Sequence, residues 1–248
     1  MFRRIFGTAI AAGIAAGLLL SVLHHTFTAP IIAEAEKYEK PVTASLSVAP
    51  LHAVAHSGDV RAVPVHSGTA AGQAHGHGDE AWEPADGLER IAYTTLADVL
   101  VSVGFALLLV AGFALTGESG ATPRAVLWGL AGFATFTLSP GLGLPPEVPG
   151  SLSADISDRQ VWWVGAAAAC AVGLGLMVFA RRTALKVAGV LVVAVPHLIG
   201  APQPEQFGGS APPELAGHFA AATIVCSAIF WAVLGWLTGG IWRRLAPA

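Results

Sequence analysis

The chain has 248 residues, of which 54% are hydrophobic and only 12% are charged. A soluble domain has about 25% charged residues, so we expect lipid rather than water to surround most of this chain. The net charge of −3 gives no basic surface for nucleic acid. The two cysteines, Cys170 and Cys226, lie inside apolar runs, which argues against a disulfide framework.

The first apolar run covers residues 5–26 and follows Arg3 and Arg4. A basic start and an apolar core are also the parts of a signal peptide. However, residues 26–29 (TFTA) make a poor cleavage site, and the run is nearly long enough to cross a bilayer. We therefore predict a retained membrane helix over residues 1–28. Gly13 and Gly17 form a GxxxG pattern, which favours close packing against another helix.

The segment 29–90 is polar and rich in Ala, His, Pro, Ser, Gly and acidic residues. No helical or strand period runs through its middle, so we predict a largely flexible loop, with residues 31–40 as one candidate continuation of the first helix. Five further apolar runs follow, at residues 91–115, 125–142, 161–180, 184–199 and 215–241. The predicted fold class is all-α: a polytopic membrane protein with about six transmembrane helices, five of them in a domain over residues 91–248.

Charge predicts the orientation of these helices, because basic residues are enriched on the cytoplasmic side. With the N-terminus inside, eight of the thirteen basic residues lie at cytoplasmic helix ends: Arg3, Arg4, Arg124, Arg181, Arg182, Lys186, Arg243 and Arg244. An even number of spans places the C-terminus inside as well. The prediction is a bacterial inner-membrane protein with residues 29–90 in the periplasm.

Every histidine then falls in the outer loop or near the outer end of a helix. His75 and His77 are separated by one glycine and are followed closely by Asp79. Imidazole combined with carboxylate suits divalent transition metals, so this tract is a candidate for metal capture. The alternative is a polar linker of biased composition, since such a short tract has low specificity.

Six more residues, within or beside the predicted helices, are candidate metal ligands: His24, His25, Asp98, Glu147, His197 and His218. A carboxylate such as Asp98 costs about 2.5–3.5 kcal/mol at a helix centre, so it should face a partner or a water-filled cavity. The alternatives are an interhelical hydrogen bond for Asp98, interfacial positions for the histidines, and a rigid outer loop around Glu147. Nucleophile elbows, Walker loops and HExxH motifs are absent, so we predict neither catalytic residues nor an enzyme.

Six short motifs occur in order along nearly the whole chain. They are residues 1–4 (MFRR), 33–39 (AEAEKYE), 82–90 (WEPADGLER), 144–147 (LPPE), 159–163 (RQVWW) and 196–202 (PHLIGAP). Together they resemble the CbtA family of predicted cobalt transporter subunits. The resemblance implies cobalt uptake linked to cobalamin synthesis and a small histidine-bearing partner subunit of the CbtB type. It implies no defined set of binding residues.

Three functions are compatible with this sequence. We favour a subunit of an uptake system that transports Co²⁺, with Ni²⁺ or Zn²⁺ as alternative ions and no permanently bound cofactor. The second is a haem-binding or electron-transfer membrane protein with His197 and His218 as axial ligands. The third is a non-transporting scaffold with a metal-sensing loop. The expected partners are the lipid bilayer, the small subunit and, as an alternative, a second copy of the chain, but no nucleic acid.

Overall fold

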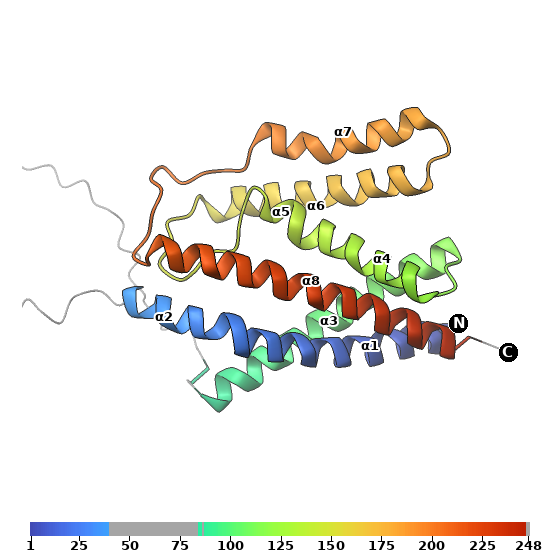
Figure 1. Cartoon of the computed structure of the whole chain (residues 1–248), viewed down its shortest axis with the longest axis horizontal. Coiled ribbons are helices and arrows are strands. Elements are labelled where there is room, and N and C mark those ends of the chain that lie inside the picture. The colour runs from blue at the N-terminus through green and yellow to red at the C-terminus, as the bar shows by residue number, and fades with distance from the viewer. Residues whose placement is uncertain (40–83, 86, 247–248) are drawn as a thin grey trace, which may run out of the picture.

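The computed structural model describes residues 1–39, 84–85 and 87–246, and over these residues the fold is all-α (Figure 1). The first helical rod consists of α1 (Phe2–Leu23), a π-helical turn (His24–Thr28) and α2 (Ala29–Glu39). The second is α3 (Leu88–Thr116), and the third consists of α4 (Thr122–Phe133), a π-helical turn (Ala134–Leu138) and α5 (Ser139–Gly141). The others are α6 (Ile156–Phe179), α7 (Thr183–Ile199) and α8 (Pro213–Arg244). The predicted fold class is confirmed.

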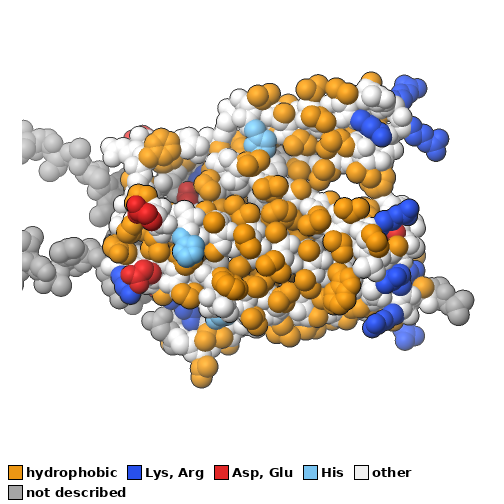
Figure 2. Space-filling model, in the orientation of Figure 1, with side chains coloured by type: hydrophobic (Ala, Val, Ile, Leu, Met, Phe, Trp, Pro, Cys, Tyr) orange, Lys and Arg blue, Asp and Glu red, His pale blue; other side chains and the backbone are white. Residues whose placement is uncertain are grey.

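Within the described residues, four helices are long and apolar enough to cross a membrane: Phe2–Tyr38, Leu88–Thr116, Ile156–Phe179 and Pro213–Arg244. The apolar helix Thr183–Ile199 is shorter, and the π-helical turn divides the rod over residues 122–141. Large apolar side chains such as Leu100 and Val172 are exposed, and hydrophobic side chains cover the face shown in Figure 2. A surface this apolar is suited to lipid, as in a membrane protein.

Both chain termini lie at the same end of the helical array (Figure 1). Lys and Arg side chains gather at this end (Figure 2). The C-terminus of α3, the α6–α7 connection and the C-terminus of α8 also lie there (Figure 1). Because basic residues favour the cytoplasmic side, this arrangement agrees with the orientation expected from the sequence. We call this end of the molecule the basic end.

The core lies where α1, α3, α4 and α8 meet. The ring of Trp231 on α8 stacks on Phe136, with the ring centroids 5.8 Å apart, and lies 4.6 Å from Phe105 on α3. The helices approach closely at small residues: a Cβ added to Gly129 would lie 2.1 Å from the Trp231 carbonyl oxygen. Such small-residue contacts hold helices together where lipid removes the hydrophobic drive for association. α6 and α7 form a separate hairpin beside this core.

At the end opposite the termini, two connecting loops are joined by their backbones. The Leu152 N–H donates to the Gly208 carbonyl at 3.0 Å, and the Ser210 N–H donates to the Gly150 carbonyl at 3.0 Å. Asp155 then caps α6 by accepting hydrogen bonds from Ser157. The bonds from the Ser157 side chain and backbone lower the pKa of the Asp155 carboxyl below its ordinary value. These contacts fix where α6 begins.

Candidate metal site

The candidate site lies between α1 and α3, and two glycines of α1 allow these helices to pack closely. A Cβ on Gly13 would lie 2.5 Å from Val103 Cα, and a Cβ on Gly17 would lie 2.6 Å from Val99 Cα. No larger residue fits at these distances, so the two backbones approach as a GxxxG face allows. The packing role predicted for Gly13 and Gly17 is confirmed. The close approach at these glycines also brings the next turns of α1 and α3 together.

The π-helical turn His24–Thr28 follows directly, just before Pro30. A proline ring in a helix clashes with the carbonyl four residues earlier and removes one backbone donor. The wider π turn relieves that crowding, because the Ala29 N–H bonds to the His24 carbonyl five residues back. The Thr28 hydroxyl donates to the same carbonyl at 3.0 Å. The turn therefore places His24 and His25 where the regular helix is interrupted, a common position for functional residues.

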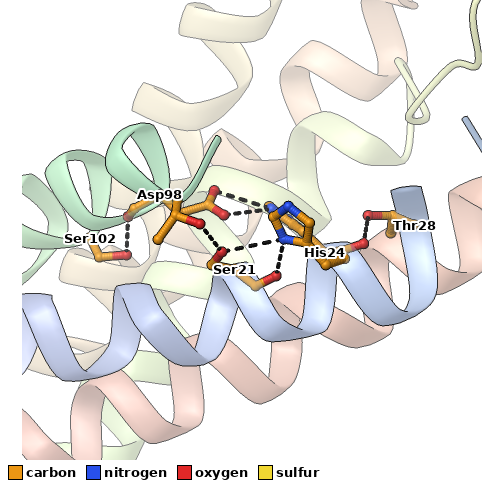
Figure 3. Close-up of polar contacts among 7 residues, drawn as sticks. Ser21, His24, Thr28, Asp98 and Ser102 are labelled. Carbon is orange, nitrogen blue, oxygen red and sulfur yellow. Dashed lines mark hydrogen bonds and ion pairs between the residues drawn. The ribbon is translucent and has the colours of Figure 1, made fainter. Parts of the chain in front are cut away.

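His24 pairs with Asp98 across the α1–α3 contact (Figure 3). The His24 Nδ1 atom lies 3.1 Å from each Asp98 carboxylate oxygen, and the Asp98 side chain is only 11% exposed. A carboxylate oxygen accepts, so Nδ1 carries the proton and donates. In the neutral ring, the lone pair then belongs to Nε2. A carboxylate that holds a histidine in this way is the usual support of a metal-binding imidazole.

Two hydroxyl groups extend the polar cluster along the same contact (Figure 3). The Ser21 Oγ lies 2.7 Å from the Thr95 Oγ1 and 3.3 Å from the His25 Nδ1. The His25 Nδ1 also lies 2.7 Å from the Ser21 carbonyl, to which it donates. His25 therefore has the same tautomer as His24, with Nε2 as the lone-pair nitrogen. We call His24, His25, Asp98, Ser21 and Thr95 the α1–α3 polar cluster.

Ser21 and Thr95 were not singled out from the sequence. The sequence does contain a pattern that could have identified them. Ser21 precedes His24 by three residues, and Thr95 precedes Asp98 by three. Residues at this spacing share one helix face. The sequence therefore contains a polar stripe on one face of each of these two helices, which indicates a polar contact for each face. No pattern in the chain alone pairs those two helices, so the partners could not be assigned.

The other candidates within the described residues lie elsewhere. The His197 Nε2 lies 3.3 Å from the Ser139 Oγ, and its ring meets the Trp162 ring edge-on. Glu147 accepts from Arg159 at 2.7 Å and from the Ser153 hydroxyl at 2.6 Å, so its charge already has a cationic partner. His218 is exposed on α8.

His75, His77 and Asp79 lie outside the described residues. Among the residues that are described, no group of three or more His, Cys, Asp and Glu side chains is arranged to hold a metal ion. The α1–α3 polar cluster thus offers imidazole nitrogens without a complete protein shell. An ion there would keep water or take ligands from another segment or subunit.

Comparison with protein families assigns the chain to a family. A family model, CbtA, described as a probable cobalt transporter subunit, matches residues 2–243. Comparisons with curated proteins and with solved structures gave no match. The matched range contains every helix described above except Arg244, the last residue of α8. The chain therefore belongs to the CbtA family of probable cobalt transporter subunits.

Proposed function

We propose that this chain is the membrane subunit of a cobalt uptake system in a bacterial inner membrane, serving cobalamin synthesis. The family match over residues 2–243 carries this proposal, and it favours transport over the haem-binding alternative. The basic end faces the cytoplasm, as the distribution of Lys and Arg supports. Residues 40–83 then lie on the periplasmic side, with His75, His77 and Asp79 available to gather ions.

The first membrane-embedded ligand in this proposal is the Nε2 atom of His24. Its support is the Asp98 carboxylate, which lies 3.1 Å from Nδ1 on the other side of the ring. His25 offers a second Nε2 from the neighbouring position of the π-helical turn. A transport site must bind its ion weakly enough to release it, and an incomplete protein shell serves that purpose. His197, His218 and Glu147 stay candidates for later steps.

The driving force in this proposal is the membrane potential. A divalent cation that moves inward gains about 4.6 kcal/mol per 100 mV, twice the value for a single charge. A small histidine-bearing partner of the CbtB type supplies the ligands that the described part of this chain lacks at the α1–α3 polar cluster. A second copy of the chain is the alternative source of those ligands.

Cobalt uptake into cells that lack other cobalt importers tests the proposal. We expect saturable accumulation when this chain is expressed with its small partner, and little or none with either subunit alone. Immunoblots of isolated membranes control for insertion. Absence of uptake in every combination, with both proteins present in the membrane, would contradict the proposal. It would leave the non-transporting scaffold as the better explanation.

Competition between metals provides a separate prediction. Sites with nitrogen ligands bind Ni²⁺ and Cu²⁺ more tightly than Co²⁺, whereas Mg²⁺ prefers oxygen ligands. At cobalt concentrations that saturate uptake, we expect an equal concentration of Ni²⁺ to reduce the initial rate of cobalt uptake by about half or more, following this affinity order. A tenfold excess of Mg²⁺ should leave the rate unchanged. Equal inhibition by Ni²⁺ and Mg²⁺ would argue against an imidazole-based pathway.

A further inference from the structure

A cavity lies at the basic end, at the start of α1, whereas His24 and His25 of the α1–α3 polar cluster follow the end of that helix. The start of α1, the end of α3 and the end of α8 line an open cavity of about 960 Å³. Cavities of this size hold drug-sized ligands. The proposed transport path does not use any residue of this cavity.

The walls of the cavity are mainly apolar. Phe113 is fully buried at its inner side, and Ala114 and Gly7 line it beside the helix ends. Phe6 also lines the cavity, and its side chain is 51% exposed. One turn further, Ile10 continues this exposed apolar face. The apolar wall of the cavity therefore continues, through Phe6, onto an exposed apolar stretch of α1.

Two arginines give the cavity a positive charge. The Arg4 Nε donates to the Trp242 carbonyl at 2.9 Å, and its guanidinium lies 3.7 Å from the centre of the Trp242 ring. Arg4 is thus held in place before any ligand arrives. Arg3 is exposed and, within residues 1–39, 84–85 and 87–246, takes part in no ion pair.

The one acidic side chain among the residues that line the cavity is already compensated. The Glu118 carboxylate accepts from the Gly120 N–H and the Ser119 hydroxyl, each at 3.3 Å. It also lies 3.8 Å from the Arg124 guanidinium. The positively charged side chains among the residues that line the cavity are those of Arg3 and Arg4.

We propose that this cavity binds an anionic phospholipid. Arg4 and Arg3 contact the phosphodiester, and an acyl chain lies along Phe6 and Ile10. Basic pockets between helices on the cytoplasmic side suit such head groups, because the charge and the membrane depth match. A free phosphate would use the arginines but not the apolar wall.

Native mass spectrometry of the full chain in neutral detergent tests this proposal. Phosphatidylglycerol is titrated in, with phosphatidylcholine as the zwitterionic comparison and sn-glycerol 1-phosphate as a soluble competitor. We expect phosphatidylglycerol to bind more tightly than phosphatidylcholine. Arg3→Gln and Arg4→Gln should each weaken its apparent Kd about fivefold. Gly7→Leu should weaken it too, because a side chain there fills the cavity wall, where the nearest atom to an added Cβ is Leu245 Cδ1 at 3.4 Å.

The matched control is the double substitution Arg181→Gln/Arg182→Gln. Both residues lie at the basic end between α6 and α7, and neither lines the cavity. Equal weakening by this control would show a diffuse charge effect and overturn the proposal. Equal affinity for the two lipids would overturn it as well, and so would full competition by sn-glycerol 1-phosphate. Because Arg3 makes no ion pair with any other described residue, Arg3→Gln stays informative if Arg4→Gln unfolds the chain.

Discussion

Replacing His24 with alanine is expected to abolish saturable cobalt uptake, whereas Asp98→Ala is expected to weaken it through the apparent affinity. The two residues differ because the His24 Nδ1 donates to Asp98 and leaves Nε2 for the ion. His24→Ala removes the proposed ligand itself. Asp98→Ala leaves the imidazole in place but without its support, and loss of such a support costs about 10- to 100-fold in metal affinity. Initial uptake rates at increasing cobalt concentrations measure both effects.

Asp98→Asn separates orientation from charge. The amide oxygen of asparagine accepts the same hydrogen bond from His24, but the negative charge is lost. We expect the half-saturation concentration of Asp98→Asn to fall between the native value and that of Asp98→Ala. The double substitution His24→Ala/Asp98→Ala should be no worse than His24→Ala alone, since groups that act as a unit are not additive.

Ser102→Ala is the matched control for these substitutions. Ser102 is fully buried one turn from Asp98, and its hydroxyl donates only to the Asp98 backbone carbonyl, at 2.6 Å. Its removal changes the polarity beside the α1–α3 polar cluster but leaves the His24–Asp98 pair intact. Uptake should therefore stay near the native level. Native uptake by His24→Ala would show that the ion does not use this cluster.

The helices could be predicted from the sequence because a segment that crosses a lipid bilayer must be apolar over a known length. A span needs about 20 apolar residues, and the runs predicted at 91–115 and 215–241 lie inside α3 and α8. The predicted run at 125–142 also overlaps its rod, although Pro140 interrupts regular hydrogen bonding. The structure resolves this conflict with the π-helical turn Ala134–Leu138 before that proline. Hydropathy carries no information on such a turn, so it could not be foreseen.

The candidate site was harder to predict from the sequence than the helices were. Hydropathy indicates how deep a residue lies in the membrane, but it does not indicate which residue on another helix it contacts. Depth identified His24 and Asp98 separately as polar residues near the outer ends of their helices. Their pairing depends on the register between α1 and α3, which the close approach at Gly17 sets. The same reasoning could not separate His24 from His197, since both are histidines at similar depth. Only the packing shows a carboxylate beside one and a hydroxyl beside the other.

Because glycine sets that register, Gly13→Ala and Gly17→Ala are expected to destabilise the protein. An added Cβ would stand 2.5–2.6 Å from a backbone Cα of α3, so the helices must move apart. Overpacking of this kind costs about 1–3 kcal/mol, which exceeds the gain of about 0.5–1 kcal/mol from alanine in a helix. Thermal unfolding in detergent can be followed with a thiol-reactive dye, because Cys170 and Cys226 are buried until the fold opens.

Gly104→Ala provides the matched control, since it adds the same methyl group to α3 at a position where no described atom of another helix lies within 4 Å of the added Cβ. It should leave stability unchanged or raise it slightly. Gly17→Ala should also raise the half-saturation concentration for cobalt, because the new Cβ would lie 3.1 Å from the Asp98 carbonyl oxygen. Gly13 lies a full turn further from the pair, so Gly13→Ala should affect stability more than affinity. Equal stability of Gly13→Ala, Gly17→Ala and Gly104→Ala would mean that α1 and α3 are not packed at these glycines, and the pairing of His24 with Asp98 would lose its structural basis.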